Sequence, residues 1–167
     1  MSGARRIATA GLITAAALIL SYLESLIPLN FGVPGIKLGL ANVAVLVALT
    51  LLGPRYAAAV SVVRVLISGL LFSGVSAMLY ALSGAALALA AMLLLRRSRR
   101  LGLVGVSVAG AVAHILGQLL CATAVLKSGA VWLASPLMFA AAAVTGTLNG
   151  LIAGLVCKGV RAGVSRP

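Results

Sequence analysis

Long apolar runs alternate along the chain with short stretches that contain Arg, Lys, Pro or Gly. A helix of about 20 apolar residues crosses the roughly 30 Å hydrocarbon core of a membrane, so each run predicts a membrane span. The predicted spans are residues 7–27, 38–52, 56–72, 75–95, 103–126 and 136–157. The second and third are short and are separated only by the tripeptide GPR, which leaves five spans or a re-entrant segment as the alternative.

The composition predicts an all-α integral membrane protein. Hydrophobic residues make up 63% and charged residues 8% of the 167 residues, and the mean hydropathy is +1.24. Soluble domains have about 25% charged residues. We therefore expect a single membrane domain, residues 1–167, built as a six-helix bundle. Cys121 and Cys157 lie in or at the end of apolar runs without CxxC spacing, which is typical of packing residues.

Basic residues are concentrated in the loops on one side of the predicted bundle. Ten of the thirteen fall there: Arg5, Arg6, Arg55, Arg96, Arg97, Arg99, Arg100, Lys158, Arg161 and Arg166. The other side has Lys37 and Lys127, and Arg64 lies inside the third span. Because cytoplasmic loops are enriched in Lys and Arg, we expect a multi-pass protein of the cell membrane with both termini cytoplasmic. Topology thus explains the net charge of +12, and a nucleic-acid partner is not expected.

Small residues recur at four-residue spacing in three of the predicted spans. Residues 103–126 contain Ala113, Gly117 and Cys121, residues 136–157 contain Gly146, Gly150 and Gly154, and residues 7–27 contain Gly11, Ala15, Ala17 and Ser21. Faces of this kind let membrane helices approach closely. We interpret those of the last two spans as packing within the bundle. For the first span, internal packing and docking of a separate membrane partner are both open.

The few polar side chains within apolar runs are candidate functional residues, because a charge near the bilayer centre costs roughly 2.5–3.5 kcal/mol. Glu24, the only acidic residue, lies near the outer end of the first span, and Lys37 follows the Pro/Gly-rich stretch PLNFGVPG, which we interpret as a lid. Asn42 begins the second span and Arg64 lies mid-way along the third. Arg64 and Glu24 are expected to form a structural ion pair, to line a ligand pocket, or both.

The fifth span contains the only histidine, His114, one turn before Gln118 and one turn after Gly110. This i, i+4, i+8 spacing puts all three on one helical face. A buried His of this kind either satisfies a local hydrogen bond or contacts a ligand or proton. Thr145 and Asn149 in the last span are weaker additions to the same polar stripe.

Several kinds of chemistry are absent from the sequence. With one Glu and no Asp there is no carboxylate pair for Mg²⁺ or for acid/base catalysis, and no Ser/His/Asp triad. A G-x-x-x-x-G-K-[ST] nucleotide loop is also missing. We therefore predict that the chain is not an enzyme and has no metal or cofactor of its own.

The stretches YLESLIP, PGIKLGLAN, VVRVLISGLLFSG, LYALSGAALALAAM and SVAGAVAHILGQL occur in this order over roughly residues 7–157. Together they resemble the family of small bacterial membrane proteins called heptaprenyl diphosphate synthase component I, or Gx transporters. The segment PGIKLGLAN and the H-x-x-GQL block are the specific parts. The family usually has Asn after this His, whereas Ile115 follows His114 here, so the role of a second polar group at that position is in doubt.

The resemblance implies a protein similar to the substrate-binding S components of energy-coupling factor transporters. In those proteins six helices form an outward-facing pocket below the loop after the first helix, and a small-residue face of that helix docks a transmembrane coupling subunit driven by ATPases. The docking residues carried over from this resemblance are Gly11 and Ala15, flanked by Ala8. The ligand pocket is expected to use the polar residues identified above: Glu24, Lys37, Asn42, Arg64, His114 and Gln118.

Three functions follow from this comparison. The first is a transport component that binds a small solute and depends on partner subunits for energy. The second is a non-catalytic membrane subunit that associates with the catalytic subunit of a prenyl diphosphate synthase. The third is a structural membrane subunit of a flavin- or quinone-linked electron-transfer system.

Overall fold

Helices make up the parts of the chain that the computed structural model describes, which are residues 2–26, 39–97 and 101–164. The α-helices are α1 (Gly3–Leu26), α2 (Asn42–Leu51), α3 (Pro54–Ser68), α4 (Val75–Leu95), α5 (Leu103–Leu126) and α6 (Ser135–Val164). A π-helical turn, η1 (Gly69–Ser73), extends α3, and a 3-10 helix, η2 (Gly129–Ala134), precedes α6. The all-α prediction is confirmed for these residues.

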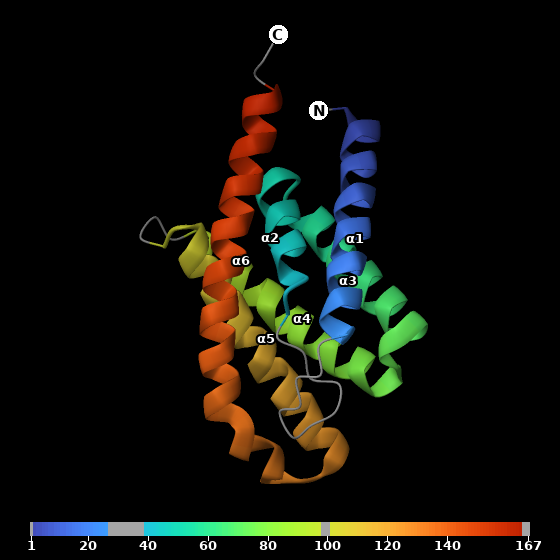
Figure 1. The fold of residues 1–167 in the computed structure, drawn as a ribbon, viewed down its shortest axis with the longest axis vertical. Helices are drawn as coiled ribbons and strands as arrows, with labels where there is room; N and C mark the ends of the chain where they lie inside the picture. Colours follow the sequence, from blue (N-terminus) through green and yellow to red (C-terminus); the bar gives the residue numbers. More distant parts are fainter. Residues whose placement is uncertain (1, 27–38, 98–100, 165–167) are drawn as a thin grey trace.

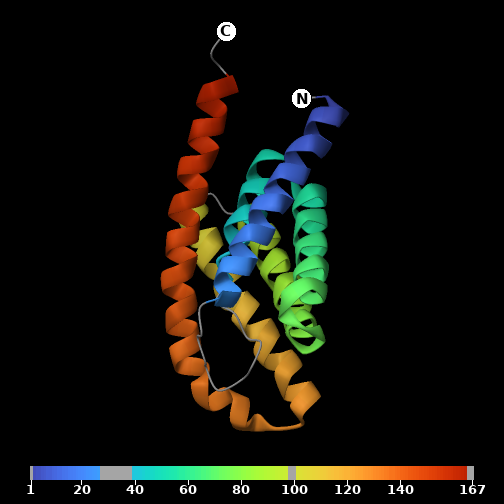
Figure 2. The same cartoon turned by 45° about the vertical axis from the view of Figure 1, so that its right-hand side comes forward.

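Successive helices run in alternating directions, so the two ends of the described chain lie at the same end of the molecule (Figures 1 and 2). The connection from α2 to α3 lies toward that end as well, whereas α5 and α6 are joined at the opposite end (Figure 1). Arg55 is the second residue of α3, Arg96 directly follows α4, and Lys127 directly follows α5. That the termini face the cytoplasm stays a prediction from the loop charges.

Five described segments are long and apolar enough to cross a membrane: Gly3–Leu26, Pro54–Ser73, Val75–Leu95, Leu103–Leu126 and Gly129–Gly163. The exception is α2, predicted as a span over residues 38–52. It has ten residues and is therefore about 15 Å long, half of the hydrocarbon thickness. Its first eight residues, 42–49, are all buried. An all-apolar helix enclosed by its neighbours has the same hydropathy as a membrane span, which is why the sequence did not distinguish them.

Glycines set the close approach of the last two long helices. A Cβ added to Gly150 would lie 2.6 Å from Cα of Val104, and one added to Gly146 would lie 2.8 Å from Cα of Val108. On the other side of α5, a Cβ on Gly117 would lie 2.6 Å from the backbone oxygen of Ser83 in α4. These contacts agree with the interpretation of the small-residue faces in α5 and α6 as packing surfaces.

Candidate functional site

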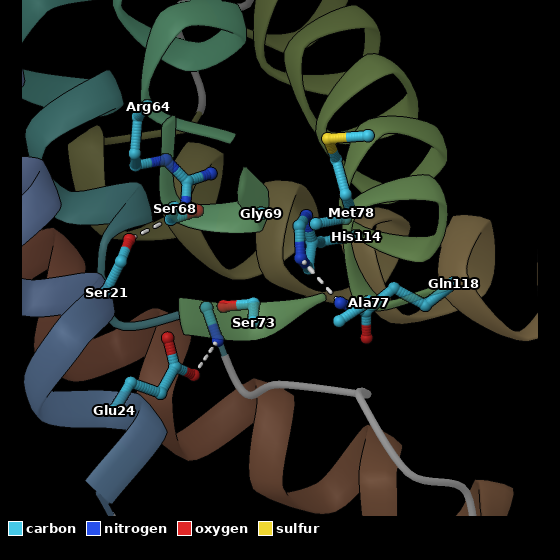
Figure 3. A pocket seen from close by; sticks show the side chains of 12 residues that line it. Ser21, Glu24, Arg64, Ser68, Gly69, Ser73, Ala77, Met78, His114 and Gln118 are labelled. Carbon is cyan, nitrogen blue, oxygen red and sulfur yellow. Dashed lines mark hydrogen bonds between the residues drawn. The ribbon is translucent and has the colours of Figure 1, made fainter. Parts of the chain in front are cut away.

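Polar side chains from α1, α3 and α5 meet at a small cavity (Figure 3). Four residues of the predicted site line it: Glu24, Arg64, His114 and Gln118. Asn42 does not line the cavity, but its Oδ1 accepts a hydrogen bond of 3.5 Å from Arg64 Nη2. Lys37 and the predicted lid, residues 28–35, lie outside the described residues.

Arg64 is 5% exposed and lies in the interior of the bundle. Besides the bond to Asn42, its Nη1 donates to Ser21 Oγ at 3.4 Å. Both distances are at the long limit for N–H···O bonds, and Nε has no partner among the described residues. The guanidinium therefore has bonding capacity that its described neighbours leave unused. Glu24, of opposite charge, faces the same cavity.

The Glu24 carboxylate is connected to the backbone just before α2. Its Oε1 accepts a 2.6 Å hydrogen bond from the N–H of Gly39, while Nδ2 of Asn149 in α6 donates to the C=O of the same glycine at 3.1 Å. Gly39 has φ of 82°, a conformation that glycine adopts readily. Side chains of α1 and α6 thus hold one backbone unit at the edge of the cavity.

His114 and Gln118 form a buried pair one helical turn apart. Nε2 of Gln118 lies 3.0 Å from Nε2 of His114, and with the amide in this orientation it donates, so the imidazole accepts at Nε2 and its proton lies on Nδ1. Nδ1 packs on the backbone of Gly84 without an aligned hydrogen bond within the described chain. Oε1 of Gln118 also has no partner there. His114 is thus a neutral donor in this arrangement.

The site as a whole has more hydrogen-bonding groups than the described residues satisfy. Three donors and one acceptor lack partners: Asn42 Nδ2, Arg64 Nε, His114 Nδ1 and Gln118 Oε1. Each such buried group costs about 1–3 kcal/mol, and native structures have few of them. The cavity of about 20 Å³ has room for roughly one water molecule. Within the described chain, no cluster of three or more His, Cys or acidic residues is present that would hold a metal ion.

Sequence reasoning missed several residues of the cavity wall, among them Ser21, Ser68 and Ser73. A signal was present for two of them, since Ser21 lies three residues before Glu24 and Ser68 lies four after Arg64, so each shares a helical face with a charged residue. Ser21 was interpreted only as a small packing residue. Ser73 reaches the cavity through the π-helical turn, which the hydrophobic pattern does not reveal.

Gly39→Ala is expected to destabilise the protein by about 1–3 kcal/mol. The positive φ disfavours Ala, and the new Cβ would lie 2.7 Å from Nδ2 of Asn42, which contacts Arg64. Gly53→Ala is the matched control, because Gly53 has φ of 97° but no atom within 4 Å of an added Cβ. Thermal unfolding in detergent should show a loss of stability for both variants and a larger loss for Gly39→Ala. Equal losses would contradict the close packing of Gly39 against Asn42.

The predicted docking residues of α1 lie on its exposed surface. Ala8, Gly11 and Ala15 are all exposed, and a Cβ added to Gly11 meets no atom within 4 Å. The small-residue face that contains Gly11 therefore makes no close helix contact within the described chain. Ala17 and Ser21, by contrast, are buried against the bundle.

A family of known proteins resembles this chain over most of its length. The family model for heptaprenyl diphosphate synthase component I matches residues 13–156, which includes α2 to α5 in full and every cavity residue named above. No curated protein and no solved structure matches the chain. The match spans most of the sequence and agrees with the resemblance seen in its motifs. The chain therefore belongs to the heptaprenyl diphosphate synthase component I family.

Proposed function

We propose that this protein is a membrane transport component that binds a small polar solute between α1, α3 and α5 and takes its energy from partner subunits. The observation that supports it most directly is the cluster of unpartnered buried polar atoms, with Arg64 and Glu24 facing one cavity. Polar groups inside a membrane protein are expensive and are typical of a ligand or ion path. A solute that accepts from Arg64 and His114 and donates to Gln118 would satisfy three of these four atoms, all except Asn42 Nδ2.

The size of the cavity bears on how such a solute enters. About 20 Å³ accommodates one water molecule, so a larger solute needs a displacement of the wall. The backbone at Gly39 is held by two side-chain hydrogen bonds, and Glu24 supplies one of them. We propose that exchange of the Glu24 bond opens the site. The basic end of the bundle, where both termini lie, faces the cytoplasm in this proposal.

Native mass spectrometry of the purified full-length chain tests the proposal. The expected result is a retained small molecule that is lost after exchange into excess unliganded detergent buffer and regained from a membrane extract. A protein that carries only detergent and phospholipid, and recovers nothing from the extract, would refute solute binding. The mass of the retained species identifies the solute class.

Gly11→Leu is expected to abolish association with a transmembrane coupling subunit and to leave solute retention unchanged. Gly11 is exposed and has open space around it, so the fold accepts the larger side chain while a close-packed helix partner does not. Gly159→Leu is the control, because Gly159 in α6 is equally exposed and equally free of neighbours. Co-purification of membrane partners with each variant measures the effect. Undiminished association of Gly11→Leu would contradict docking at this face.

A second candidate function is a non-catalytic membrane subunit of heptaprenyl diphosphate synthase, which the family description favours. The chain has no Asp and a single Glu, so the catalytic Mg²⁺ ligands would come from the partner. Affinity purification of the tagged protein distinguishes the two. Recovery of a soluble prenyl synthase by a protein that retains no solute would favour this candidate over the first.

A further inference from the structure

A second, larger cavity lies at the basic end of the bundle, away from the Arg64 site. Its volume is about 280 Å³, against about 20 Å³ for the polar cavity. The described part of the wall consists of α2, the first turn of α5, and the residues Arg96 and Leu101. Leu46 is the α2 residue of this cavity that comes nearest in sequence to Asn42, which contacts Arg64, so four residues of α2, or about 6 Å, lie between the two sites.

The cavity leads from the surface into the core. Arg96 and Leu101 at one side of it are exposed, whereas Leu46 and Val106 at the other are 1% and 4% exposed. Its volume is close to the lower end of the range for small-molecule sites, about 300 Å³. A chain-like ligand can therefore enter beside Arg96 and Leu101 and reach the interior.

The wall chemistry is that of an amphiphile site. Among the described residues that line it, five of seven are Leu or Val, and Arg96 is the charged one. Thr50 donates its hydroxyl proton to the C=O of Leu46 at 2.8 Å, so it offers no further donor. Arg96 is thus the group that selects a head, and a guanidinium binds phosphate well. Basic pockets between helices at the cytoplasmic side of membrane proteins bind phosphorylated lipid heads.

Arg96 also has a simpler role that involves no ligand. It follows the last residue of α4, where a positive charge stabilises the helix dipole, and Arg97 beside it would do the same. Only Arg96 lines the cavity, however. The two arginines therefore form a natural pair for separating a ligand contact from a general charge effect.

We propose that this cavity binds a phosphorylated amphiphile, with its hydrocarbon chain between α2 and α5 and its phosphate at Arg96. The ligand is either an anionic phospholipid or a prenyl diphosphate, since both combine an apolar chain with a phosphate. The proposal goes beyond solute binding at Arg64 and does not depend on it.

Native mass spectrometry of the delipidated full chain tests this with four probes: dioleoyl phosphatidylglycerol, dioleoyl phosphatidylcholine, farnesyl diphosphate and farnesol. We expect phosphatidylglycerol to bind better than phosphatidylcholine and farnesyl diphosphate better than farnesol, each by about tenfold. Competition between the two anionic probes identifies which kind of amphiphile the cavity binds. A tenfold preference for farnesyl diphosphate indicates a prenyl ligand, and a preference for phosphatidylglycerol indicates a membrane lipid.

Arg96→Gln should reduce binding of the anionic probes about tenfold and Arg97→Gln should not. Leu103→Phe, which narrows the cavity without altering its charge, should weaken the binding of farnesyl diphosphate and leave Arg96 in place. Equal effects of the two arginine variants, or equal binding of the charged and neutral probes, would overturn the proposal. Retention of the solute at the Arg64 site is recorded in the same spectra, so failure of one site is distinguishable from failure of the other.

Discussion

Arg64→Gln should lower the affinity for the retained solute by about 10- to 100-fold, the equivalent of one lost charge-assisted hydrogen bond. The guanidinium is 5% exposed, makes only long bonds to Ser21 and Asn42, and keeps Nε unpartnered among the described residues. Removing its charge also leaves Glu24 without an opposite charge at the same cavity, which should destabilise the fold by about 3–5 kcal/mol. Solute titration and thermal unfolding in detergent measure the two effects separately.

The double variant Glu24→Gln/Arg64→Gln separates a structural ion pair from a ligand site. If the two charges serve only to stabilise each other, removing both should restore stability, because no buried charge is left uncompensated. If Arg64 also contacts the solute, stability should recover while affinity stays low. Arg55→Gln, at an exposed position near the start of the same helix, controls for a general loss of positive charge. Full solute affinity in Arg64→Gln would contradict the proposed site.

The long helices were predictable because charge and glycine mark their ends. The predicted spans 75–95 and 103–126 coincide with α4 and α5, since an arginine cluster lies between them and Lys127 ends the second. The short length of α2 was not predictable, because the hydropathy of an apolar segment is the same whether lipid or protein surrounds it. Its length and its burial on all sides become visible only in three dimensions.

The charged and amide residues of the site were predictable for an energetic reason. Glu24, Arg64, His114 and Gln118 lie within apolar runs, where each needs a partner or a role, and the structure brings these four to one cavity. The serines lack this energetic signal and share only a helical face with a charged residue, because a serine hydroxyl can bond to the carbonyl one turn earlier in its own helix. Ser68 does this with the C=O of Val65. The hydrogen bond from Asn149 to Gly39 was also not predictable from the sequence, since it joins residues 110 positions apart.

The packing of α5 against α6 decides whether His114 and Gln118 stay at the cavity, because both side chains are carried by α5. Gly150→Ala should destabilise the protein by about 1–3 kcal/mol. The added Cβ would lie 2.6 Å from Cα of Val104, and a backbone atom cannot rotate away, so the two helices must separate.

Gly154→Ala is the matched control, one turn along the same face of α6. A Cβ there meets nothing closer than the Leu103 side chain at 3.9 Å, so the better helix propensity of Ala should stabilise the protein by about 0.5–1 kcal/mol. Thermal unfolding should therefore show that Gly150→Ala lowers the stability of the protein and that Gly154→Ala raises it. Gly150→Ala should also weaken solute retention, since the shift of α5 moves the His114–Gln118 pair. Similar effects of the two alanines would mean that α5 and α6 do not approach as closely as the backbone contacts at Gly150 require.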